Sequence, residues 1–462
     1  MQRTLLAGLA LALLLSGCAT YSDSFGVIQH NLAAQQYDDA LKVIEKQSGS
    51  KTDRVLYLLN KGMVLRMKRD FTGSNQALEA AKMEMERLYA ASVSEHTLSF
   101  LVNDATVSYG GEDYEQVLVH LYMALNYLEL GQPGEARVEA MQVDAKLREI
   151  GEKFSGNKFT EDALSRYLTG LIFEELGEWS DAMISYREAY EAYKKYQANY
   201  GTAMPEMLKH DLLRLSKRQG LKDEEKQYRN AFGIALPPAI NDAVKQGELV
   251  FILNNGLAPI KREKVTSLSA PPPSMVMDAA ANKPITLAPA VFVDIALPYY
   301  ESQANNVTGA RIRVAEKQAN TELMENIDAI ARSSLNSHMA AITARSIARA
   351  IAKVQIQETV DRAGERSNND PAVEILSSIF VRVASVATER ADTRSWLTLP
   401  ANIQMARLPL PPGTYTITVE LLDANSQIVT ARNYPGVVIT EARKTYLTQH
   451  WTPSIQPSTV RR

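Results

Sequence analysis

The sequence has almost no cysteine: Cys18 is the single thiol in 462 residues. The chain therefore cannot form an internal disulfide, and cysteine catalysis would need that one residue. An excess of one charge sign is missing as well, because 50 Lys and Arg residues nearly balance 53 Asp and Glu residues and leave a net charge of −3. Without a basic field, we expect no nucleic-acid partner.

Recognisable catalytic and ligand-binding motifs are also lacking. The 6 histidines are scattered and form no close pair of the kind that binds a metal. Neither a Gly-x-Ser-x-Gly elbow nor a Gly-x-x-x-x-Gly-Lys-Ser phosphate loop occurs. We therefore expect a protein that is not an enzyme, with no cofactor, no metal and no small-molecule substrate.

Long hydrophobic runs are missing too. The apolar stretch of residues 5–15 is shorter than the roughly 20 residues that a membrane-spanning helix needs, and no later stretch is long enough. A basic start, a short apolar core and small residues before a cut site are typical of secretory signals. Residues 1–17 are thus predicted to be a cleavable signal peptide.

The residues at the predicted cut site, Leu15-Ser16-Gly17-Cys18, resemble the lipobox of Gram-negative bacterial lipoproteins. The resemblance implies that Cys18 carries a lipid and becomes the first residue after cleavage. Acyl chains hold a protein on a membrane because each buried methylene contributes about 0.8 kcal/mol. Within this resemblance, Ala19 in place of an aspartate favours the outer membrane, with the periplasmic face as the default. The alternative is an ordinary export signal with a chance cysteine.

Residues 18–235 show helical periodicity with internal self-similarity. In the clearest unit, residues 170–189, small and aromatic residues recur in the order that resembles a tetratricopeptide repeat. Small residues in this pattern let two antiparallel helices approach closely. The residues expected at the turns are spaced 34, 62 and 46 apart, so the later copies carry insertions; they are Tyr37, Phe71, Pro133 and Trp179. The alternative is an array of helical hairpins unrelated to that repeat.

The inner face of such a helical stack is predicted to be an unusually apolar groove. An exposed strip of this kind would be a liability in water, so something must cover it. Either a partner protein's helix or extended segment binds there, or the chain's own insertion or C-terminal half fills it. The candidate groove residues are Leu56, Leu59, Met63, Leu121, Leu125, Tyr167, Leu171 and Glu174.

Residues 236–462 are predicted to form a mixed α/β domain. Strands are expected within 248–316, and two helices, 321–364 and 371–391, are expected to pack as a long hairpin because both are rich in alanine. A break near Ser337 is the alternative to a continuous first helix. Alternating residues in 401–450 predict a C-terminal antiparallel β module. The expected fold is mainly α: a tetratricopeptide-like solenoid followed by this mixed domain.

A short polar segment before that module contains Asp392, Arg394 and Trp396, which could form a functional site. The structural alternative is a corner in which Trp396 plugs the core and Asp392 pairs with Arg394 or caps a turn. With the lipobox, the repeats and the strand at 410–421, this segment is similar to a family of Gram-negative lipoproteins that has no established activity to transfer.

These observations favour a lipid-anchored, non-catalytic adaptor or assembly scaffold of the cell envelope, which binds a protein partner through its repeat groove. Two alternatives remain. One is an enzyme acting on cell wall or lipid, with its site near Asp392 and Arg394. The other is a purely structural subunit of an envelope complex.

Overall fold

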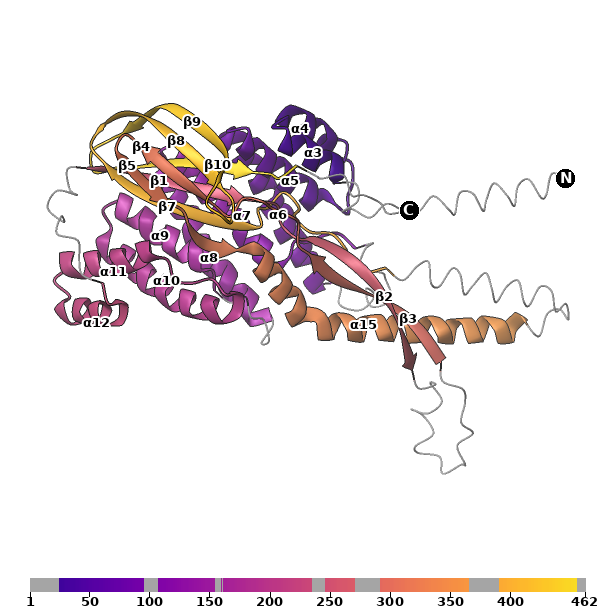
Figure 1. Ribbon diagram of the computed structural model, residues 1–462. Helices are drawn as coiled ribbons and strands as arrows, with labels where there is room; N and C mark the ends of the chain where they lie inside the picture. The colour runs from indigo at the N-terminus through magenta and orange to yellow at the C-terminus, as the bar shows by residue number, and fades with distance from the viewer. Residues whose placement is uncertain are drawn as a thin grey trace.

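The computed structural model describes residues 25–94, 107–153, 159, 161–234, 246–270, 291–364 and 390–454. The predicted signal peptide, Cys18 and most of the predicted second hairpin helix, residues 371–389, lie outside this part of the chain. Over the described residues the chain is mainly α, with a helical-repeat half followed by sheets and one long helix (Figure 1).

The N-terminal half is a stack of helical hairpins. The four residues predicted at the turns are the first residues of α4, α6, α8 and α10. Glycine permits the close approach of paired helices: a Cβ on Gly170 would overlap the ring of Tyr186 on the facing helix. The helices are α3 (Gly26–Ala33), α4 (Tyr37–Glu45), α5 (Arg54–Met67), α6 (Phe71–Ser94), α7 (Asp113–Glu129), α8 (Pro133–Lys153), α9 (Ala163–Glu175), α10 (Trp179–Tyr200), α11 (Glu206–Arg218) and α12 (Lys222–Phe232).

Two four-stranded sheets face each other in the C-terminal half and form a β-sandwich. The first has the order β10-β1-β7-β6 and the second the order β5-β4-β8-β9. Their facing side chains, among them Phe251, Ile312 and Val419, make one hydrophobic cluster. The strands are β1 (Gly247–Asn255), β4 (Gly309–Val314), β5 (Lys317–Asn320), β6 (Glu322–Asn326), β7 (Asn402–Leu410), β8 (Gly413–Leu422), β9 (Ile428–Ile439) and β10 (Lys444–Trp451).

The strands predicted at 401–450 are present but do not form a separate antiparallel module. β7 and β10 lie on either side of β1, and β10 pairs with β1 in parallel. The physical reason is the burial of β1 on both faces. Phe251 points into the sandwich, whereas Val250 and Ile252 belong to the hydrophobic core of the helical repeats. A central strand of this kind needs hydrogen-bonded neighbours on both edges.

Three elements project together from the repeats and the sandwich, which we call the body. We call these three elements the arm. They are the two-stranded antiparallel ribbon of β2 (Ile260–Ala270) and β3 (Val291–Glu301), and the helix α15 (Ile327–Gly364). With 38 residues, α15 is about 57 Å long. Figure 1 shows α15 crossing the ribbon and both extending beyond the sandwich and the repeats.

The helix predicted to begin at residue 321 begins six residues later. Residues 322–326 form β6 because they pair with β7, and the side chain of Asn326 then caps α15 by accepting a hydrogen bond from Ala329 N at 3.1 Å. The helix continues through Ser337 without a break. Among the described helices, none has the length and apolar character needed to cross a membrane.

Candidate functional site

The predicted partner groove is closed by the protein itself. Its apolar members are at most 2% exposed, and they share one core with residues of the sandwich such as Ile252, Met324 and Met405. Hydrogen bonds also cross between the halves: Tyr122 donates to Asn254 Oδ1 at 2.9 Å, and Tyr193 donates to the carbonyl oxygen of Met324 at 3.0 Å. The prediction of an open groove for a separate partner is therefore wrong.

The alternative, that the C-terminal half fills this groove, is what the structure has. The buried groove residues are Leu56, Leu59, Met63, Leu121, Leu125, Tyr167 and Leu171. Their burial satisfies two needs at once, because the apolar strip of the repeats and the second apolar face of the β1 sheet are both removed from water.

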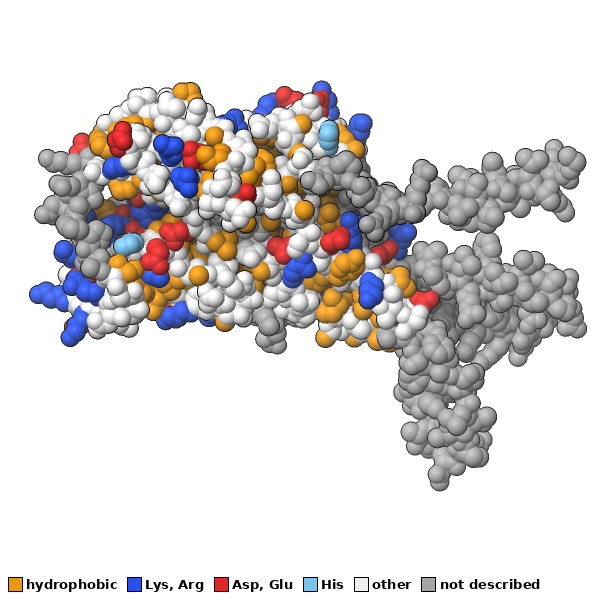
Figure 2. Space-filling view, in the orientation of Figure 1, with side chains coloured by type: hydrophobic (Ala, Val, Ile, Leu, Met, Phe, Trp, Pro, Cys, Tyr) orange, Lys and Arg blue, Asp and Glu red, His pale blue; other side chains and the backbone are white. Residues whose placement is uncertain are grey.

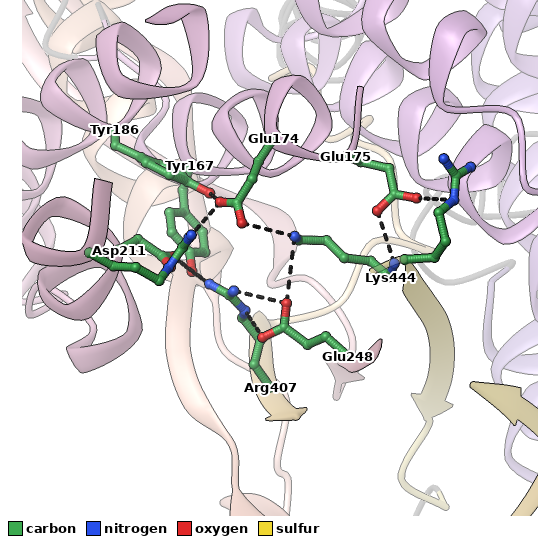
Figure 3. Close-up of polar contacts among 10 residues, drawn as sticks. Tyr167, Glu174, Glu175, Tyr186, Asp211, Glu248, Arg407 and Lys444 are labelled. Carbon is green, nitrogen blue, oxygen red and sulfur yellow. Dashed lines mark hydrogen bonds and ion pairs between the residues drawn. The ribbon is translucent and has the colours of Figure 1, made fainter. Parts of the chain in front are cut away.

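A network of largely buried charges crosses the same boundary (Figure 3). Arg407 of β7 lies at its centre. Its guanidinium binds both oxygens of Glu248 on β1, at 2.8 and 2.9 Å, and also contacts Asp211 of α11. The hydroxyl of Tyr167 lies 2.7 Å from the same guanidinium. Burial alone would lower the pKa of Arg407, but Asp211 and Glu248 outweigh it and raise that pKa.

Glu174, a predicted groove residue, belongs to this network instead of facing a partner. It binds Arg214 at 2.6 Å and Lys444 of β10 at 3.3 Å, and it accepts a hydrogen bond from Tyr186 at 2.9 Å. Burial opposes the ionisation of Glu174, but Lys444 and Arg214 outweigh it and hold its pKa below the usual range. The carboxylate is thus a fixed negative charge between helices and sheet.

The paired charges of this network are arranged to hold the sheet on the helices and not to carry out a reaction. The acids Glu174, Asp211 and Glu248 each contact at least one of the bases Arg214, Arg407 and Lys444. A buried pair of this kind fixes geometry, and removing one partner is costly. Over the described residues, no group of three or more His, Cys, Asp or Glu side chains is placed to hold a metal ion.

The predicted corner at residues 392–396 has the geometry of a structural element. The guanidinium of Arg394 binds both oxygens of Asp392, at 2.8 and 2.9 Å, and reaches Asp53 at 3.2 Å. It also donates to the carbonyl oxygen of Val107 at 2.8 Å. These contacts tie the segment to the beginning of α5 and to the residues before α7.

Trp396 fills the core beside this corner. Its side chain is fully buried, its indole N–H donates to Thr398 Oγ1 at 2.9 Å, and its ring meets Tyr122 edge-on with centroids 6.0 Å apart. The backbone N–H of Trp396 donates to Glu115 Oε1 at 2.7 Å. The sequence singled out the tryptophan, but Glu115 carried no local signal.

Comparisons with known proteins add little. No protein-family model matches the sequence, and no curated protein matches it. Among solved structures, a crystal structure of MamA is similar with a TM-score of 0.28 and 12% identity, over 43% of this chain and 88% of that one. A second MamA structure gives 0.29 and 12% over 47% and 97%, and MamA AMB-1 gives 0.26 and 14% over 46% and 92%. At these values the likeness carries no argument about fold or function.

Proposed function

We propose that this protein is a non-catalytic adaptor of the cell envelope that is held at the outer membrane by lipid on Cys18 and binds a partner protein with its arm. The observation that carries the proposal is that the repeat groove is filled whereas the arm is not covered by the rest of the described chain. The repeat groove is occupied by the chain's own sandwich, whereas β2, β3 and α15 project from the body. We therefore infer that a partner protein binds to the arm and not in the groove.

The arm carries apolar side chains that its own packing leaves in water. Val265 on β2 is 57% exposed and Tyr299 on β3 is 43% exposed. Figure 2 shows hydrophobic side chains gathered on the visible face where α15 and the ribbon meet the body. Because two strands alone are only marginally stable, and because clustered exposed apolar groups are typical of interaction surfaces, a bound protein would suit this element.

Site-specific photo-crosslinking in intact cells tests the proposal. A photoreactive amino acid is placed at Val265 or at Tyr299, with Ile184 on α10 as the control position because it is also apolar and 49% exposed. We expect one shared protein to be captured from both arm positions and not from Ile184. Capture of the same proteins from all three positions, or none from the arm, would overturn the proposal.

The anchor is tested separately by mass spectrometry of the native protein. We expect an acylated amino terminus at Cys18 after removal of residues 1–17. An unprocessed and unacylated amino terminus would refute the placement at the membrane, whereas the crosslinking result would still stand for the arm.

A further inference from the structure

The two sheets of the sandwich have four edge strands, and three of these are covered or short. β10 is largely buried, and its Lys444 N donates to Glu175 of α9 at 2.9 Å. At β6, Tyr193 of α10 donates to the carbonyl oxygen of Met324 at 3.0 Å. β5 has only 4 residues, and short edge strands offer little backbone for pairing.

The fourth edge strand, β9, is both long and exposed. It has 12 residues, most of which are exposed, and it pairs with β8 alone. Within the described part of the chain no strand bonds to its other edge, so alternate N–H and C=O groups there face outward. Figure 1 shows β9 at the upper rim of the sandwich. An edge of this kind can accept another extended segment as an added strand.

Two irregularities limit the part of β9 that can accept a strand. Its pairing with β8 shifts register beside Val429 and again at Pro435 and Gly436. Between these points, residues 430–434 pair regularly with residues 421–417 of β8. Bulges and proline protect long sheet edges against uncontrolled pairing. The regular edge is therefore five residues long, which suits a short extended segment.

Arg432 lies at the centre of this regular edge. Its cross-strand partner is Val419, a core residue, so the Arg432 side chain lies on the core side of the sheet, where it is exposed at the rim. Its guanidinium is 5.2 Å from the centre of the Tyr434 ring, and no carboxylate of the described chain pairs with it. An acid directly opposite on an added strand would supply that pair.

We propose that residues 430–434 bind an extended segment of another protein by strand addition, with an aspartate or glutamate of that segment opposite Arg432. This edge is separate from the arm, which projects from the body elsewhere (Figure 1). It would give the protein a second binding surface, and it does not depend on the function proposed for the arm.

A second copy of this chain fits the edge less well. If two copies paired antiparallel about a two-fold axis along all of residues 430–434, each Arg432 would lie opposite the other. Like charges directly opposite each other destabilise a strand pair. A shifted register would avoid this contact but would pair fewer than five residues. The edge therefore favours an acidic segment over self-association.

Two fluorescent peptides, acetyl-Thr-Val-Glu-Val-Thr and acetyl-Thr-Val-Lys-Val-Thr, test the proposal with the full-length protein. By fluorescence polarisation at low salt, we expect the acidic peptide to bind roughly 5-fold more tightly than the basic one, because it places a carboxylate opposite Arg432. Arg432→Glu should reverse this preference. Lys222→Glu makes the same change of charge at an exposed position of α12, on the opposite side of the molecule in Figure 1, and should leave the preference unchanged.

Hydrogen exchange with the acidic peptide bound locates the binding. We expect slower exchange of alternate backbone amides in residues 430–434 and no change in β10. The proposal would be overturned by a lack of saturable binding, or by an unchanged peptide preference in Arg432→Glu. A dimer of the wild-type protein in which these amides are already protected would also overturn it. Neither measurement involves the arm or the lipid, so failure here would leave the proposed function standing.

Discussion

Among single residues, Glu325 is the clearest case of a side chain whose environment opposes its charge. The irregular pairing of β6 with β7 leaves both Met324 and Glu325 fully buried. The hydroxyl of Tyr196 lies 3.4 Å from Glu325 Oε1, and no cation pairs with this acid in the described part of the chain. Burial, with a further contribution from Asp162, raises the pKa of Glu325 well above its ordinary value.

Glu325→Gln should therefore stabilise the protein at neutral pH. The raised pKa means that stability contributed by the neutral acid is present below about pH 4.5 and declines as the pH rises toward the folded-state pKa. Replacing the acid by its neutral isostere should add roughly 1–3 kcal/mol to the free energy of unfolding at pH 8 and little at pH 4. Urea unfolding at both pH values measures this. A loss of stability at pH 8 would contradict the argument.

At the scale of elements, the charge network makes a prediction about how the sheet is held on the helices. Arg407→Met removes the cation shared by Asp211, which is buried, and Glu248, which is half-buried, and leaves them only their contacts with Arg214 and Lys444. We expect a loss of about 3–5 kcal/mol in the free energy of unfolding. Arg443→Met is the matched control: Arg443 also reaches an acid, Glu175 at 2.9 Å, but its side chain is 51% exposed, so its loss should cost less than about 1 kcal/mol. Equal losses in the two variants would show that burial does not decide the effect.

The sequence predicted the elements better than their partners. Periodicity located the helices whose first residues are Tyr37 and Trp179, since each helix depends on neighbouring residues. It could not predict that Arg407 meets Asp211, or that Trp396 meets Glu115, because these contacts join residues 196 and 281 positions apart. The prediction of a helix over residues 322–326 fails for the same reason, because their strand conformation comes from pairing with β7.

Over the whole molecule, the shared core implies that repeats and sandwich unfold as one unit. The helices contribute most of the far-ultraviolet circular dichroism. In Trp179→Phe, fluorescence reports only on Trp396, in the shared core, and on Trp451, at the end of β10. We expect urea transitions measured by the two signals to coincide. Two separated midpoints would show that residues 18–235 and 236–462 are independent domains.

The position of β10 has a consequence for biogenesis. This strand completes the sheet that seals the apolar face of the repeats, yet it is synthesised after all the helices of the repeats and after its partner strand β1. Until β10 has been synthesised, the nascent polypeptide must therefore expose this apolar face of the repeats to water. Such a chain would depend on a chaperone to keep it from aggregating until β10 is in place.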